Sequence, residues 1–267
     1  LDSLQADGSL SASDADRLAA TPRSRVQAMM HPVTFLATLE LSDPASDVKV
    51  HTGDCLMNWL AESTGQAYYH IDPLKIDVAA VTTVMSLAFA RHHKILAVEV
   101  EDGRILVVSA EPFVSAWVPG LEQVNRTRVE RALALPEDIA RYTGEFYTLS
   151  QSITGATAQR GQRSGSGLGN LEQMLELGSA QEPAANDQHI VSIVDWLLQY
   201  AFDQRASDIH LEPRRDIGRV RFRIDGVLHA IYELPAQVAA AVTSRVKILG
   251  RMDLAETRRP QDGRLKT

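Results

Sequence analysis

The sequence contains one cysteine, Cys55, among 267 residues. A lone cysteine cannot close a disulfide within the chain, and it cannot supply the thiolates of a cysteine-based zinc site. The histidines, including the adjacent His92 and His93, show no metal-ligand spacing with acidic residues, so we expect no bound metal. Scarce cysteine is typical of a reducing compartment, and we therefore expect a cytoplasmic protein.

Long apolar runs are also missing, because charged residues or histidine interrupt each of them within about a dozen residues. The sequence therefore predicts no membrane-spanning helix. No charged-then-apolar leader of the secretory kind opens the chain. Since the chain begins at Leu1 and not at methionine, we expect it to be a fragment of a longer protein.

The sequence lacks the motif G-x-x-x-x-G-K-[ST], so no phosphate-binding loop of that type is complete. A glycine cluster, Gly165-x-Gly167-x-Gly169, has no Lys-Ser/Thr after it and no strand before it, which indicates flexibility and not a phosphate cradle. No serine lies on a G-x-S-x-G turn. We therefore expect no ATP hydrolysis by this chain alone.

The charge is unevenly divided along the chain. The first 202 residues hold 14 Lys/Arg against 25 Asp/Glu, whereas residues 203–267 hold 13 against 9. The overall charge of -7 opposes the phosphate contacts that dominate nucleic-acid binding, so nucleic acid is not expected as the main partner. Residues 203–267, which carry the excess of positive charge, can still bind a local anion.

Residues 1–150 are expected to form a first domain with a helical start followed by a small α/β unit. Helix-cap chemistry marks residues 1–22, apolar periodicity predicts helices over 51–64 and 76–94, and Pro136 opens a further helix over 135–149. Residues 66–71 are typical of a strand. Two β-branched segments around Asp102-Gly103 predict a hairpin, because this dipeptide suits turns with positive φ.

Residues 151–184 are expected to be a flexible linker, because residues 150–170 are rich in Ser, Gly, Gln and Thr. Residues 185–267 are expected to be a second domain with the order α-β-β-β-α. Its first helix spans 185–206, with Asn186 or Asp187 as cap, and its last runs from about Gln237 to Arg251. The predicted fold class is therefore α+β, with two small domains joined by a flexible linker.

The segment "GRVRFRIDG", residues 218–226, alternates Arg219, Arg221 and Arg223 with apolar residues. In a strand this spacing gives one apolar face and one face of three guanidinium groups. Such a face fits a nucleic-acid track, cross-strand ion pairs or a phosphate clamp. The preceding strand places Asp208 and Glu212 on one face, so ion pairs are expected, with one guanidinium in surplus. Arginine can grip phosphate oxygens with its planar fork.

Three phrases, "ASDIH", "RIDG" and "RRPQDGR", occur in that order within residues 197–264. In this arrangement the segment resembles the region before the motor of the GspE/PulE ATPases of type II secretion and type IV pilus assembly. The resemblance implies a parent protein that forms a homohexamer and whose motor binds ATP with Mg²⁺. It also implies that this module lies against the ATP of a neighbouring subunit.

On this resemblance, Arg221, with Arg223 as second choice, is expected to contact that nucleotide's phosphate. Arg219 is expected to pair with the acidic strand of Asp208 and Glu212. No cofactor is expected in the fragment itself, and the whole-chain acidity opposes the alternative of a nucleic-acid-handling relative.

The first domain is similar, more loosely, to the first N-terminal domain of the same ATPases, with its best match from His70 to Val100. The resemblance implies docking onto the cytoplasmic domain of an inner-membrane assembly protein, hence a cytoplasmic protein recruited to that membrane. An alternative is a cyclic di-GMP sensor. The family's repeat R-L-G-x-x-L-x-x-x-G is reduced here to its Leu-to-Gly interval in "LDSLQADGSL", and no second copy occurs.

Overall fold

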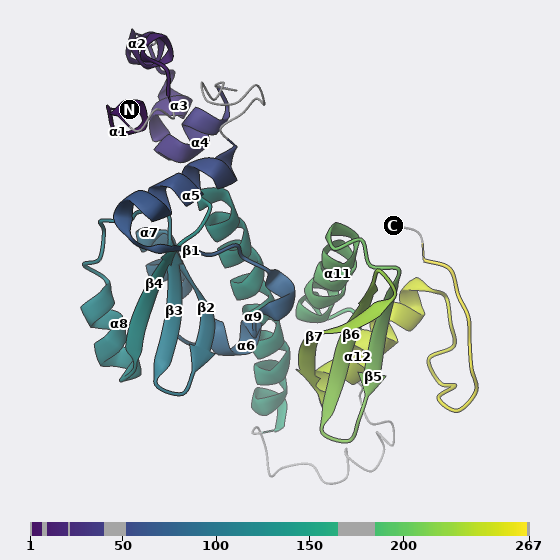
Figure 1. Cartoon of the computed structure of the whole chain (residues 1–267). Helices are drawn as coiled ribbons and strands as arrows, with labels where there is room; N and C mark the ends of the chain where they lie inside the picture. Colours follow the sequence, from purple (N-terminus) through teal and green to yellow (C-terminus); the bar gives the residue numbers. More distant parts are fainter. Residues whose placement is uncertain (1, 7–9, 21, 40–51, 165–184, 266–267) are drawn as a thin grey trace. The chain divides into compact units, whose positions relative to one another are not determined.

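The computed structural model describes residues 2–6, 10–20, 22–39, 52–164 and 185–265 (Figure 1). The chain divides into two compact units, Leu1–Gly144 (unit 1) and Glu145–Thr267 (unit 2). Helices and strands are mixed in both, and the strands form two separate sheets. The predicted α+β class is confirmed. Within the described residues, no helix is long and apolar enough to cross a membrane.

Unit 1 begins with short helices whose ends match local capping chemistry: α1 (Asp2–Ala6), α2 (Ala12–Ala20), α3 (Arg25–Met29), α4 (Pro32–Ala37) and α5 (Gly53–Thr64). Ser24 and Gln27 form a reciprocal capping box at α3. Thr52 caps α5, and Gly65 ends it at φ 68°, a conformation that suits glycine. Leu56 and Met57 of α5 are buried together with Leu4, Leu10 and Leu18, which joins α1, α2 and α5 in one apolar cluster.

The sheet of unit 1 has the strand order β1-β4-β3-β2. The predicted hairpin is confirmed: β2 (Ile95–Glu101) and β3 (Arg104–Ser109) are antiparallel, and Gly103 between them has φ 85°. The short β1 (Ala67–Tyr68) lies in the predicted strand segment. A further strand, β4 (Arg128–Leu133), runs parallel to both β1 and β3 and was not predicted.

The single helix predicted over residues 76–94 is wrong. The segment forms two helices, α6 (Val78–Val81) and α7 (Leu87–His93). Asp77 caps the first by accepting the N–H of Ala80, and Ser86 starts the second by accepting the N–H of Phe89. The chain therefore turns between them. A 3-10 turn, η1 (Pro73–Lys75), precedes α6, and α8 (Val118–Asn125) lies between β3 and β4.

The predicted linker is wrong over residues 151–164, because α9 (Pro136–Ser164) continues through them. Leu149, Ile153 and Ala156 lie on one stripe of the helix and are buried. Gly155 packs against the ring of His189, so close that a Cβ would lie 2.5 Å from its Cε1. Burial of this stripe outweighs the weak helix propensity of the local composition. Residues 165–184 of the predicted linker lie outside the described residues.

Unit 2 has the predicted α-β-β-β-α order: α11 (Gln188–Asp203), β5 (Asp208–Pro213), β6 (Ile217–Ile224), β7 (Val227–Pro235) and α12 (Ala236–Leu249). The strands are antiparallel in the order β5-β6-β7. The turn at Asp225 and Gly226 has φ 49° and 81°, as expected for a tight hairpin. Helices α11 and α12 cover the apolar face of the sheet (Figure 1), where Tyr200 contacts Phe222 and Ala239 packs on Gly218.

Candidate functional site

The first candidate site is the arginine face, defined as Arg219, Arg221 and Arg223 on the polar side of β6. Val220 and Phe222 between them are fully buried, so the alternation predicted from the sequence is confirmed. Strand β5 lies antiparallel to β6, with Glu212 opposite Arg219, and Asp208 opposite Arg223. The sheet thus brings the predicted acidic and basic residues together on one surface.

Each guanidinium on the arginine face is held by a carboxylate. Arg223 Nε donates to Asp208 Oδ2 at 3.0 Å, across the directly opposed pair. Arg221 reaches diagonally to Glu212, with its Nε 3.1 Å from Oε1. Arg219 pairs with Glu233 of β7, its Nη2 lying 3.0 Å from Oε1. Three arginines are therefore matched by three carboxylates.

The expected partner of Arg219 is wrong. We expected Arg219 to pair with the strand of Asp208 and Glu212, but Glu233 of β7 binds it instead. Glu212 instead forms its ion pair with Arg221, the next arginine along β6. The predicted surplus guanidinium therefore does not occur, because the estimate counted the carboxylates of β5 alone. Glu233, the glutamate of "VLHAIYEL", could have been recognised in the sequence as a further partner. Its position opposite Arg219 in the antiparallel register determines the ion pair.

Hydrogen bonds from Ser207 and then Arg223 lower the pKa of Asp208. A hydrogen bond from Arg221 is the main cause of the lowered pKa of Glu212. Both carboxylates are therefore ionised at neutral pH, and the ion pairs are complete. All three arginines remain about one-third exposed, at 35%, 32% and 36% of their side chains. Solvent-exposed ion pairs of this kind are weak, so another anion can replace the carboxylate at small cost.

The segment "RRPQDGR" forms a closed loop after α12. The Glu256 carboxylate accepts the backbone N–H groups of Arg258 and Arg259, at 2.6 and 3.0 Å. Gln261 ties the loop to Asp253 through the Asp253 N–H and carbonyl. Gly263 packs on Gly250 so closely that a Cβ would lie 2.3 Å from the Gly250 oxygen. These contacts hold the motif against the end of α12.

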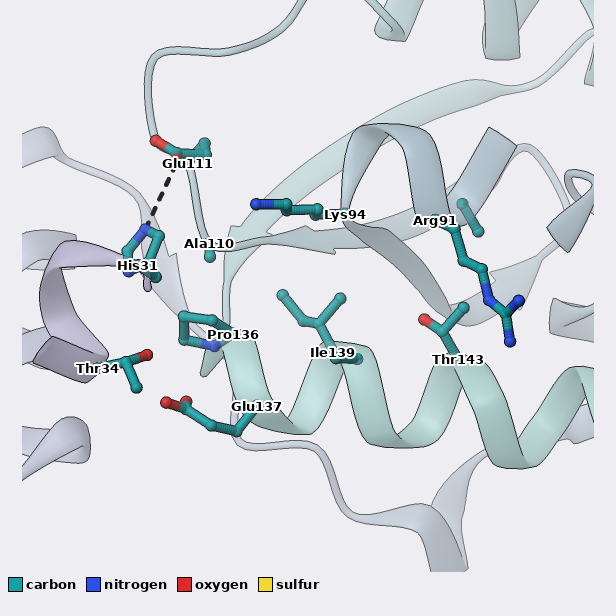
Figure 2. Close-up of a pocket in the computed structure, with 12 residues that line it drawn as sticks. His31, Thr34, Arg91, Lys94, Ala110, Glu111, Pro136, Glu137, Ile139 and Thr143 are labelled. Carbon is teal, nitrogen blue, oxygen red and sulfur yellow. Dashed lines mark ion pairs between the residues drawn. The ribbon is translucent and has the colours of Figure 1, made fainter. Parts of the chain in front are cut away.

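Unit 1 contains a cavity of about 380 Å³ that the sequence analysis did not predict (Figure 2). Its lining comes from α4, the end of α7, the end of β3 and the first turns of α9. The lining residues are His31, Thr34, Ala90, Arg91, Lys94, Ala110, Glu111, Pro136, Glu137, Ile139, Ala140 and Thr143. These residues are scattered over more than a hundred positions and share no motif, so only the folded chain brings them together.

His31 connects two sides of this cavity. Its Nδ1 accepts the N–H of Val33 at 3.2 Å and so caps α4. Its Nε2 lies 3.5 Å from Glu111 Oε1, which fits a neutral ring with the proton on Nε2. Burial lowers the pKa of His31, although Glu111 and Glu137 act in the opposite direction. Among the described residues, no group of three or more His, Cys, Asp or Glu is placed to hold a metal ion.

Two family models match parts of this chain. The model described as "Type II/IV secretion system protein" matches residues 183–267, and the MshEN domain model matches residues 64–153. Type IV pilus assembly ATPase TfpB of Acinetobacter baylyi is 47% identical over 271 residues, covering 100% of this chain and 46% of that protein.

Two relatives of lower identity are also named as pilus assembly or secretion ATPases. Type IV pilus assembly ATPase PilB of Pseudomonas aeruginosa is 28% identical over 82% of this chain and 38% of its own length. Type II secretion system ATPase E of Vibrio cholerae is 26% identical over 79% of this chain and 34% of its own length. A solved structure described as "Structure of MshE with cdg" aligns with a TM-score of 0.40 and 17% identity, over 55% of this chain and 96% of that chain. The chain spans less than half the length of these three relatives.

Proposed function

Because the chain belongs to the GspE/PilB family of type II secretion and type IV pilus assembly ATPases, we propose that it is the docking and regulatory part of a hexameric member. In this proposal the motor of the longer protein binds ATP with Mg²⁺, and the protein is cytoplasmic and recruited to the inner membrane. The observation that carries the proposal is 47% identity to TfpB along the whole chain.

Unit 2 supplies arginine contacts in this proposal. The secretion-family match, residues 183–267, contains the arginine face and the closed loop after α12. The apolar side of the β5-β6-β7 sheet is covered by helices, whereas the guanidinium groups lie on the opposite side and are partly exposed. A neighbouring subunit's nucleotide can therefore reach them without disturbing the core.

Arg221 is the first candidate for the phosphate contact, and Arg223 is the second. Arg221 uses Nε and Nη2 for Glu212, which leaves Nη1 for a second acceptor. A phosphate carries more charge than one carboxylate, so it competes for a guanidinium that an exposed ion pair holds weakly. A guanidinium supplied to a transferring phosphoryl group in trans accelerates hydrolysis by about 10³–10⁵.

The test uses the full-length ATPase and two matched variants. Arg221→Ala removes the guanidinium, whereas Glu212→Gln breaks the same ion pair but keeps the arginine. We expect Arg221→Ala to reduce ATP turnover per folded hexamer strongly, while Glu212→Gln stays close to the wild type. If both variants lose stability and neither loses turnover per folded hexamer, Arg221 is a structural ion-pair residue.

Unit 1 is the docking part in this proposal, and its partner is the cytoplasmic domain of an inner-membrane assembly protein. Residues 1–144 hold 19 Asp/Glu against 12 Lys/Arg, whereas residues 145–267 hold 15 of each. An acidic unit beside a neutral one favours a partner with a basic surface, because complementary charge steers association. Cross-linking mass spectrometry of the whole chain with that domain should place the cross-links in residues 1–144. Cross-links confined to residues 185–267 would contradict this assignment.

A further inference from the structure

Arg221, the middle residue of the arginine face, has two directly opposed neighbours that carry no carboxylate. Strand β6 lies between β5 and β7 (Figure 1), so each arginine has a neighbour on either side. For Arg221 these neighbours are His210 of β5 and Ala230 of β7. Arg221 therefore has no directly opposed carboxylate on these two strands, which the structure describes in full.

The other two arginines each have at least one directly opposed carboxylate. Arg219 lies opposite both Glu212 and Glu233, and Arg223 lies opposite Asp208. Directly opposed side chains on antiparallel strands lie closer together than diagonal ones. The outer two arginines are therefore placed for direct ion pairs, and the middle one is not.

The histidine in the middle of β5 accounts for the observed pairing. Because His210 offers no carboxylate, Arg221 reaches diagonally to Glu212 and uses Nε and Nη2 for it. Glu212 is then engaged, and Arg219 pairs with Glu233. Nη1 of Arg221 makes no hydrogen bond to a described residue. A carboxylate at residue 210 would lie directly opposite and could bind this nitrogen.

His210 also contacts Arg223, the arginine next to Arg221 on the same face. The Nη2 atom of Arg223 lies 3.4 Å from Nε2 of His210. A guanidinium has only donors, so this contact fits a ring that accepts at Nε2 and carries its proton on Nδ1. Arg223 is thereby held by His210 as well as by Asp208. His210 thus engages the neighbouring arginine and adds no anion beside Arg221.

We propose that His210 is a positioning residue that keeps Arg221 available for an incoming phosphate. This inference rests on the proposed phosphate contact of Arg221, and it adds the reason that Arg221 makes this contact. One diagonal carboxylate on a partly exposed guanidinium is a weak competitor, and a phosphate can displace it. Two carboxylates on the same guanidinium would occupy its donors and hold it on the sheet.

The experiment adds a carboxylate opposite Arg221 in the full-length ATPase. His210→Glu adds it from β5 and Ala230→Glu adds it from β7, so the test does not depend on the folding of one variant. Each should reduce ATP turnover per folded hexamer by about tenfold or more, because a guanidinium on the transferring phosphoryl group is worth far more than this. The loss should appear in kcat, with the KM for ATP little changed, because the contact acts in the transition state.

Two further variants are matched controls. His210→Gln keeps a side-chain acceptor for Arg223 and adds no carboxylate, so turnover should stay close to the wild type. Leu228→Glu adds the same charge to the same face, but opposite Arg223. It should also stay close to the wild type, which separates capture of Arg221 from a general effect of negative charge. Circular dichroism and size-exclusion chromatography measure folding and hexamer formation.

Arg221→Ala, measured in parallel, separates this inference from the proposed function. If it loses turnover whereas His210→Glu and Ala230→Glu retain it, His210 does not position Arg221, and the phosphate contact stands. If Arg221→Ala retains turnover, the phosphate contact is wrong and the role of His210 is wrong with it. An equal loss in Leu228→Glu, or in His210→Gln, would also contradict the proposal, because neither variant places a carboxylate opposite Arg221.

Discussion

The three arginines of β6 lie on the same strand, but each forms its ion pair in a different geometry. Arg223 pairs with Asp208, which lies directly opposite on β5. Arg221 pairs diagonally with Glu212 of β5, and Arg219 pairs with Glu233 of β7. Arg221 uses Nε and Nη2 for Glu212 and has no hydrogen bond from Nη1 to a described residue, whereas Arg223 also contacts His210 and the Gly226 carbonyl. Of the two arginines proposed for the phosphate contact, Arg221 therefore has the terminal nitrogen that is available for a second acceptor.

Thr143→Val should stabilise the chain. The substitution removes a buried hydroxyl that has no hydrogen-bond partner among the described residues and replaces it with a methyl group, and relief of such an unmet group is worth on the order of 1 kcal/mol. Urea denaturation of the wild type and the variant measures the difference. A variant less stable than the wild type would indicate that the hydroxyl has a hydrogen-bond partner in the free protein.

The stability of unit 1 should fall as the pH drops below about 6.5, the ordinary pKa of histidine. Burial lowers the pKa of His31 in the folded chain, so the unfolded chain binds the proton first. The contribution of His31 is therefore fully present above pH ~6.5 and is lost as the pH falls through the lower, folded pKa. Protonation of Nδ1 would also remove the acceptor of the Val33 N–H.

Thermal unfolding between pH 7.5 and 5 measures this dependence. His31→Gln should flatten the profile, whereas His92→Gln, at an exposed position of α7, should leave it as in the wild type. An identical slope in the wild type and His31→Gln would show that other groups cause the pH dependence.

At the scale of elements, local chemistry predicted the hairpins and, to within about three residues, the ends of α5, α11 and α12. Asp102-Gly103 and Asp225-Gly226 form the expected turns, and Asp187, one of two candidate caps, accepts the N–H of His189. We did not predict the caps of α6 and α7, Asp77 and Ser86, because the apolar density of residues 76–94 favoured one helix. Sequence periodicity alone does not reveal a turn between two short helices.

Elements that depend on distant partners were harder to predict. Strand β4 carries three charged residues, Arg128, Glu130 and Arg131, and is stabilised by parallel neighbours on both sides, β1 and β3. Residues 151–164 have the composition of a linker but extend α9, because Ile153 and Ala156 are buried. The predicted partner of Arg219 was wrong for the same reason, because Glu233 lies opposite Arg219 only once β7 pairs with β6. The cavity likewise joins four elements without a shared motif.

Gly218→Ala should destabilise unit 2. A Cβ at residue 218 would lie 2.2 Å from the Cβ of Ala239, so α12 would have to move away from the sheet. Overpacking of this kind costs about 1–3 kcal/mol. Denaturant unfolding, with Gly144→Ala as the control, measures the cost.

The control position lies in α9 with nothing within 4 Å of its added Cβ. Alanine there should stabilise the helix by about 0.5–1 kcal/mol, because glycine loses more backbone entropy. Equal effects of the two substitutions would show that α12 does not press on Gly218.

At the scale of the whole molecule, the predicted resemblance to the secretion and pilus assembly ATPases is confirmed by the family matches and by the relatives. Charge separates the two units, because the acidic residues in excess lie in residues 1–144. This division is consistent with the two proposed tasks, docking of a partner by unit 1 and phosphate contact by the arginines of unit 2. Neither task needs a catalytic site within the chain.

The central claim is that Arg221 acts on the nucleotide of a neighbouring subunit, and mixed hexamers of the full-length ATPase test it most directly. One variant carries Arg221→Ala with an intact phosphate-binding loop, and the other carries intact Arg221 with an inactivated loop. We expect each variant alone to be nearly inactive and the mixture to recover part of the ATP turnover, because intact loops then meet intact arginines across subunit boundaries. A mixture as inactive as its parts, with mixed hexamers verified by mass spectrometry, would contradict action in trans.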